Sequence, residues 1–193
     1  MIEGGTGPVH TVRCDTNLGY EASMDQTTHH ARITDLLGRL KETAARFTAR
    51  LEGAGARAEQ ASSGWTPAQI AVHVALVNDN LASVIEGSVP AAAPPAADFT
   101  ERSWAEVVRD VPARNESPSR FRPPEAVTAA DGVARFNESV SHLARALETL
   151  TEERARHCIN NRSVGTITLY QAGDFAIAHM IRHNQQAKRV LDA

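Results

Sequence analysis

Apolar residues recur with helical spacing along the chain, and the first such stretch begins at Asp25. Its apolar positions follow an i, i+3, i+4, i+7 pattern, formed by Ile33, Leu36, Leu37, Leu40, Ala44, Phe47 and Leu51. This spacing places them on one face of an amphipathic helix. Gly53 and Gly55 follow directly and predict the end of the helix, because glycine is favoured just after a helix C-terminus.

The second and fourth predicted helices begin with the same signal. The segments T-P-A-Q (66–69) and T-L-Y-Q (168–171) both have the form of a capping box, in which Thr and Gln side chains bond each other's backbone N–H. The second helix is expected to end near Glu86 and the fourth near Leu191. Apolar positions over residues 128–150 predict the third helix, and a glycine turn is expected over residues 160–165.

These patterns predict an all-α protein, a four-helix bundle with no strand, because the alternation of β-branched residues that strands need is missing. Residues 88–127 interrupt the helical pattern with proline, alanine and serine, apart from a short amphipathic piece around Trp104. A connection this long between two bundle helices is typical of a cover or a functional loop. Residues 1–23 lack periodicity and predict a flexible N-terminal tail before one bundle domain over 24–193. Met24 is an alternative native start.

Composition narrows the class of function. The net charge is −3, and the arginines are scattered among acids rather than gathered on the basic face typical of nucleic-acid binders. No apolar run approaches the roughly 18–20 residues of a membrane span, and the N-terminus lacks the apolar core of a signal peptide. Two cysteines, Cys14 and Cys158, are too few for a disulfide framework. We therefore expect a cytoplasmic protein that acts on a small molecule, without nucleic acid or membrane as partners.

Three of the eight histidines fall on apolar faces of predicted helices. His179 and His183 are four residues apart, so their side chains project from the core-facing side of the fourth helix one turn apart. His73 lies between Ile70 and Val77 on the apolar side of the second helix. Three imidazoles from two helices thus point toward the bundle core.

Two interpretations of these rings are open. Each ring can be an ordinary core histidine bonded to a backbone carbonyl. Alternatively, one divalent metal ion binds all three and satisfies nitrogens whose burial without partners would cost about 1–3 kcal/mol each. Gln186, one turn beyond His183, is a candidate partner that orients this ring. Tyr170 and Asp174 can lie either on the surface or beside the site, and no site is expected at the other histidines, His10, His29, His30, His142 and His157.

Two separated motifs resemble those of the DinB/YfiT-like superfamily. The segment GWTPAQIAVHVA (64–75) resembles its second helix, and SVGTITLYQAGDFAIAHMIRHNQQ (163–186) resembles its last helix with the pattern H-x-x-x-H-x-x-Q. The resemblance implies a four-helix bundle, frequent homodimers and a metal held by His73, His179 and His183. Family members of known activity are largely transferases or isomerases that depend on a thiol such as bacillithiol, mycothiol or glutathione.

Three neutral nitrogen ligands leave a coordination position open, as in catalytic rather than structural zinc sites. Imidazole ligands suit Zn, Ni or Fe, and such ions lower the pKa of a bound water or thiol. The first hypothesis is a metal-dependent transferase that activates a low-molecular-weight thiol, such as mycothiol or bacillithiol, against an electrophilic small molecule. Residues 88–127 would form part of its pocket, and no general base is evident. The alternatives are a metal-dependent hydrolase using hydroxide and a non-catalytic, stress-linked binding bundle.

Overall fold

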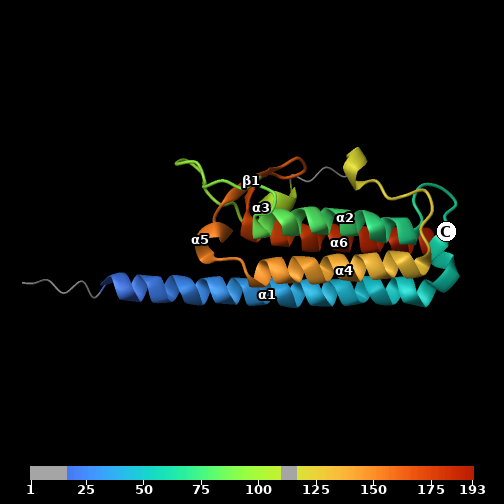
Figure 1. Cartoon of the computed structure of the whole chain (residues 1–193), viewed down its shortest axis with the longest axis horizontal. Coiled ribbons are helices and arrows are strands. Elements are labelled where there is room, and N and C mark those ends of the chain that lie inside the picture. Colours follow the sequence, from blue (N-terminus) through green and yellow to red (C-terminus); the bar gives the residue numbers. More distant parts are fainter. Residues whose placement is uncertain (1–16, 110–116) are drawn as a thin grey trace, which may run out of the picture.

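The structure is a computed structural model of the chain, and it describes residues 17–109 and 117–193, with side chains from Thr28 onward. Four long helices run along the long axis of the molecule (Figure 1). They are α1 (Asn17–Ala54), α2 (Pro67–Glu86), α4 (Ala129–Glu148) and α6 (Leu169–Leu191). The predicted all-α, four-helix bundle is confirmed.

Short elements occupy the connections between these helices. A 3-10 turn, η1 (Gly55–Glu59), follows α1. The long connection between α2 and α4 contains α3 (Trp104–Arg109) and η2 (Ser119–Phe121), so the expected short helix around Trp104 is present. The short helix α5 (Glu152–Ala155) leads from α4 to the two strands described next.

The expectation that no strand is present is wrong. Strands β1 (Cys158–Asn161) and β2 (Gly165–Thr168) form an antiparallel hairpin at the place where the sequence predicted only a turn. Each strand has four residues, too few for an alternating pattern to stand out in the sequence. Gly165, with φ of 76°, supplies a left-handed position where the chain reverses. Ala93 of the long connection also pairs with Cys158 and ties that connection to the hairpin.

Helix starts follow the predicted chemistry, with one difference in position. Both capping boxes form, at Thr66 with Gln69 and at Thr168 with Gln171. The helix α1, however, begins at Asn17 rather than at Asp25. Residues 17–27 contain no proline and a single glycine, Gly19, so the helical hydrogen bonds of the backbone continue ahead of the apolar stripe. The rest of the predicted tail, residues 1–16, lies outside the described residues.

The helix α2 forms the centre of the core, and most of its residues are buried. The expectation that no apolar stretch approaches the length of a membrane span is wrong for α2, because within the described part of the chain it is the one helix long and apolar enough to cross a membrane. Two thirds of that apolar stretch is buried inside the bundle, as in the core helix of a globular domain. Phe47 of α1 packs against Phe136 of α4, with their ring centroids 5.0 Å apart, and this contact joins α1 to α4.

Close packing of α2 against α4 depends on Gly132. A methyl group at this position would lie 3.1 Å from the Cα and the carbonyl oxygen of Ala68, which is backbone that cannot move aside freely.

We expect Gly132→Ala to lower the free energy of unfolding by about 1–3 kcal/mol, the usual cost of overpacking. Gly38→Ala, at an exposed position of α1, is the matched control, because nothing lies within 4 Å of the added methyl. Alanine's helix propensity should raise stability there by up to about 1 kcal/mol. Urea unfolding of both variants measures the difference, and equal effects would contradict the packing argument.

Candidate metal centre

The bundle brings together three histidines that are far apart in the sequence. His73 comes from the middle of α2, and His179 and His183 come from successive turns of α6. One ring nitrogen from each residue can be chosen so that all three lie within 4.8 Å of one another. Nitrogens around a tetrahedral zinc ion, at about 2.1 Å each, lie about 3.4 Å apart. Small side-chain movements reach this spacing, so the donor set fits one divalent ion.

Hydrogen bonds orient two of these rings. The Nδ1 of His73 lies 2.8 Å from the carbonyl oxygen of Phe121, and the Nδ1 of His183 lies 2.8 Å from Oε1 of Gln186. Since both acceptors are oxygens, Nδ1–H donates in each case and Nε2 keeps its lone pair for a metal. Gln186 thus has the orienting contact that its spacing predicted.

The third ring has an unsatisfied nitrogen. The Nδ1 of His179 is buried and has no hydrogen-bond partner among the described residues. Leaving a buried polar atom without a partner is unfavourable, and native structures contain few such atoms. The His179 ring is therefore not explained as a core histidine bonded to a carbonyl, which was the alternative interpretation.

The electrostatic environment keeps the three rings neutral. Burial lowers the pKa of His73 and, more strongly, that of His179. Burial, together with the nearby His73 and Arg182, lowers the pKa of His183 to about 3. Because a metal ligand must offer a lone pair, histidines held neutral at physiological pH are prepared to bind a cation.

Aromatic side chains pack against the cluster from two sides. The Trp65 ring centroid lies 5.0 Å from that of His73, and the Phe175 ring stacks on His179 at 5.8 Å. Trp65 directly precedes Thr66, the residue that caps the start of α2. His73 makes the bond to a backbone carbonyl that the alternative interpretation expected, but the sequence carries no signal for Phe121 as its partner, because any residue can present a carbonyl.

A cavity of about 1340 Å³ opens in front of the histidines. Its walls come from α2, α6, the β1–β2 hairpin and the long connection, as expected for residues 88–127. Trp104 and Val108 of α3 line it, together with Phe121 of η2. A ligand in this cavity reaches all three rings, because His73, His179 and His183 belong to its lining.

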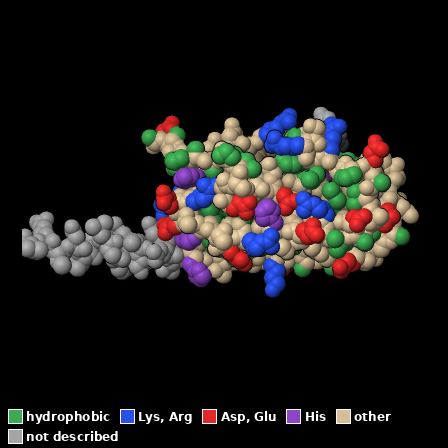
Figure 2. All heavy atoms as spheres, in the orientation of Figure 1, with side chains coloured by type: hydrophobic (Ala, Val, Ile, Leu, Met, Phe, Trp, Pro, Cys, Tyr) green, Lys and Arg blue, Asp and Glu red, His purple; other side chains and the backbone are tan. Residues whose placement is uncertain are grey.

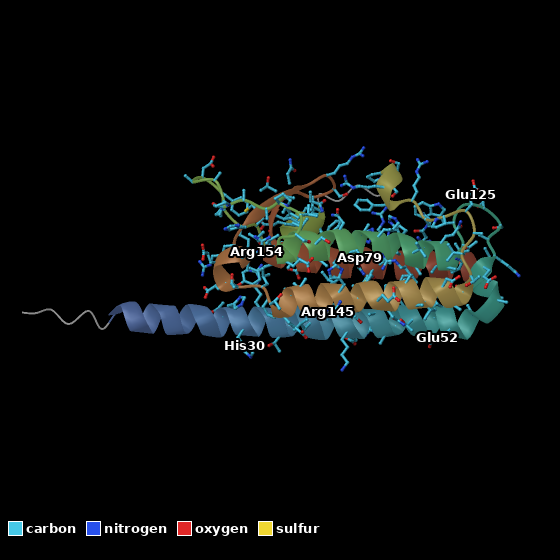
Figure 3. All side chains as sticks on the ribbon, viewed as in Figure 1. His30, Glu52, Asp79, Glu125, Arg145 and Arg154 are labelled. Carbon is cyan, nitrogen blue, oxygen red and sulfur yellow. The ribbon has the colours of Figure 1, made fainter. Side chains whose placement is uncertain are left out.

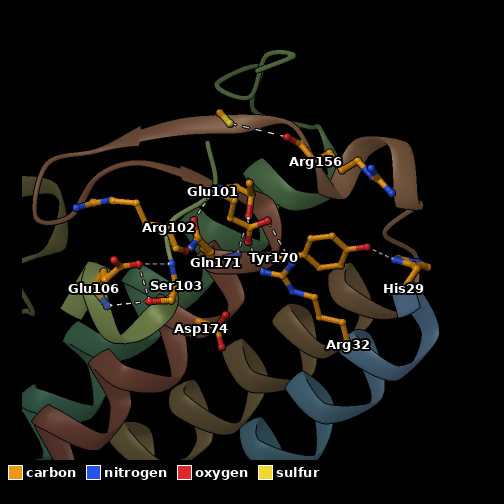
Figure 4. A network of polar contacts seen from close by, with 12 residues as sticks. His29, Arg32, Glu101, Arg102, Ser103, Glu106, Arg156, Tyr170, Gln171 and Asp174 are labelled. Atoms are coloured by element: carbon orange, nitrogen blue, oxygen red, sulfur yellow. Dashed lines mark hydrogen bonds and ion pairs between the residues drawn. The ribbon is translucent and has the colours of Figure 1, made fainter. Parts of the chain in front are cut away.

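A polar network holds the covering connection in place (Figure 4). Glu101 contacts Arg32 of α1 and accepts a hydrogen bond from the Thr168 hydroxyl at 3.2 Å. Gln171 of α6 donates from Nε2 to the carbonyl oxygen of Arg102 at 2.6 Å. The segment just before α3 is thus bonded to both α1 and α6, which positions Trp104 over the cavity.

The other candidate residues lie elsewhere. The Tyr170 hydroxyl bonds Nδ1 of His29 at 2.6 Å, and Asp174 pairs with Arg39 at 2.5 Å, so both residues contact α1 rather than the cavity. Burial raises the pKa of the Cys158 thiol, aided by the Glu101 charge, as suits a structural cysteine. His30, His142 and His157 do not join the three-histidine group, and His10 and Cys14 lie outside the described residues.

Sequence comparison agrees with this architecture. No curated protein is significantly similar to the chain. A family model described as the DinB superfamily matches residues 28–187, a range that includes the three histidines, Gln186 and both capping boxes. Because this match covers well over half of the chain, and the bundle has the helical architecture that the two motifs indicated, the chain belongs to the DinB superfamily.

Proposed function

We propose that the protein is a metal-dependent transferase that activates a low-molecular-weight thiol for attack on an electrophilic small molecule. The observation that supports this most strongly is the convergence of three neutral imidazoles, from His73, His179 and His183, on the wall of a large cavity. A divalent ion bound there supplies Lewis acidity that lowers the pKa of a bound thiol.

The side chains around the cavity favour a nucleophile that comes from outside the protein. The described lining residues include no Asp, Glu, Lys, Tyr or Cys. The described lining therefore offers no carboxylate that could act as a general base on a water molecule, and no cysteine that could attack the substrate. A thiol, with an ordinary pKa near 8.5, needs much less assistance to ionise than water does. This difference favours the thiol transferase over the hydrolase.

The chain's residues then have separate tasks. The three histidines hold the ion, while the Phe121 carbonyl and Gln186 orient two of the rings. Trp65 and Phe175 keep water from the sides of the cluster. In the transfer, the thiol loses its proton to solvent, its sulfur bonds to the electrophilic carbon, and the leaving group departs with its electron pair.

Cobalt substitution tests this proposal directly. Protein purified without a nickel column is stripped with a chelator and reloaded with Co²⁺, whose absorption reports its ligands. Addition of a thiol is expected to produce a thiolate-to-cobalt charge-transfer band, and electrophiles should then be consumed only when thiol is present. Turnover without any thiol would favour the hydrolase. Cobalt that binds without turnover of any electrophile would favour the non-catalytic binding bundle.

A further inference from the structure

Arginine supplies all the formal charge among the described residues of the cavity wall. The five arginines that line it are Arg120, Arg122, Arg162, Arg182 and Arg189, and no acidic residue accompanies them in the described lining. This arrangement is unlike that of the protein as a whole, whose net charge is −3. A cavity with one sign of charge concentrates ligands of the opposite sign.

These arginines come from separate elements that surround the histidines. Arg120 belongs to η2, Arg162 lies in the turn between β1 and β2, and Arg189 is on α6 ten residues after His179. Figure 2 shows basic side chains gathered along the edge where Figure 1 places the hairpin and η2, whereas acidic and basic side chains alternate over the helices below. The positive charge is thus distributed around the mouth of the cavity.

Three of the cavity arginines have charge available for a ligand. Within the described parts of the chain, Arg120, Arg162 and Arg189 form no ion pair. Arginines elsewhere commonly have carboxylate partners, for example Arg39 with Asp35 and Asp174. Arg120 contacts an aromatic ring instead, with its guanidinium 4.7 Å from the centroid of Phe121.

Charge balance at the histidines points in the same direction. A divalent ion held by three neutral rings keeps its full positive charge, and the described lining offers no carboxylate to offset it. One anionic atom at the ion would neutralise only part of the charge of the cavity. The positive charge of the arginines would be neutralised by further anionic groups on the ligand, away from its reacting end.

From this placement we infer that the cavity binds a small molecule carrying one or more carboxylates in addition to the group that reaches the histidines. The inference rests on the proposed function, because the reacting end is placed at His73, His179 and His183. Guanidinium groups bind carboxylates through paired, charge-assisted hydrogen bonds. Guanidinium groups bind phosphates in the same way, so displacement of the ligand by inorganic phosphate but not by succinate would assign a phosphate instead. A thiol that carries carboxylates is therefore preferred over an uncharged one, unless the carboxylates belong to the electrophile.

Two thiols that differ in charge test the inference. Cobalt-loaded protein is titrated with mercaptosuccinate, which has two carboxylates, and with monothioglycerol, which has none. We expect mercaptosuccinate to bind at least about tenfold more tightly. Arg162→Gln and Arg189→Gln should each weaken mercaptosuccinate binding by about tenfold and leave monothioglycerol unchanged. Arg145→Gln is the matched control, because Arg145 lies exposed on α4, away from the hairpin and η2 (Figure 3).

Succinate, which has carboxylates but no thiol, identifies which reactant carries them. Succinate that displaces mercaptosuccinate places the carboxylates on the thiol, whereas succinate that binds beside saturating mercaptosuccinate places them on the electrophile. Calorimetry of succinate binding to the metal-free protein and its arginine variants tests the arginines even if cobalt does not bind. Equal affinity for both thiols, with no arginine-dependent binding of succinate, would overturn the inference. Absence of any thiolate–cobalt band would instead count against the proposed function.

Discussion

Replacing His179 by alanine is expected to reduce the metal content of the protein from about one ion per chain to nearly none. Loss of a group that merely orients a ligand lowers metal affinity by roughly 10–100-fold, so loss of a ligand should cost more. The described lining of the cavity also offers no carboxylate or cysteine that could replace the lost ligand. Elemental analysis of protein purified without a nickel column measures this change.

The matched control for this experiment is His30→Ala. His30 is exposed on α1 and takes no part in the cluster (Figure 3), so its removal should leave the metal content unchanged. Circular dichroism of both variants establishes that the bundle is folded. A folded His179→Ala protein that retains one ion per chain would show that the ligand set is incorrect.

The metal-free protein is expected to lose stability as the pH falls from about 6.5 toward about 3. An unfolded histidine has a pKa near 6.5, whereas burial lowers that of His183 to about 3 in the folded state. Between these values the unfolded chain binds more protons, so the free energy of unfolding decreases as the solution becomes more acidic. His73 and His179 are shifted in the same direction and add to the effect. Together they should contribute several kcal/mol across this range.

Urea unfolding at about pH 7 and about pH 4.5 measures this loss. Carboxylates also titrate toward the acid end, so the comparison is made with His183→Gln, whose side chain is polar but cannot be protonated in this range. The variant should show a smaller loss of stability on acidification than the wild type. An identical pH dependence in the two proteins would contradict the assignment of His183 as a buried, neutral ring.

Much of the bundle could be predicted because its signals are local. A capping box depends on residues three apart, and an apolar stripe depends on the repeat of a single helix. Placing His73, His179 and His183 on inward faces required only these local patterns. The hairpin was missed because its strands are short and because its pairing with Ala93 joins distant parts of the chain.

What the sequence by itself determined is therefore the four long helices, the capped starting points of α2 and α6, and the face of the helix on which each of the three histidines lies. Only the tertiary structure decided that the faces of α2 and α6 meet, that the Phe121 carbonyl orients His73, and that arginines from η2, the hairpin and α6 surround one cavity. The physical reason is the distance along the sequence over which each kind of interaction acts. Helix propensity and capping act within a few residues, whereas a binding site depends on distances between segments that the sequence separates.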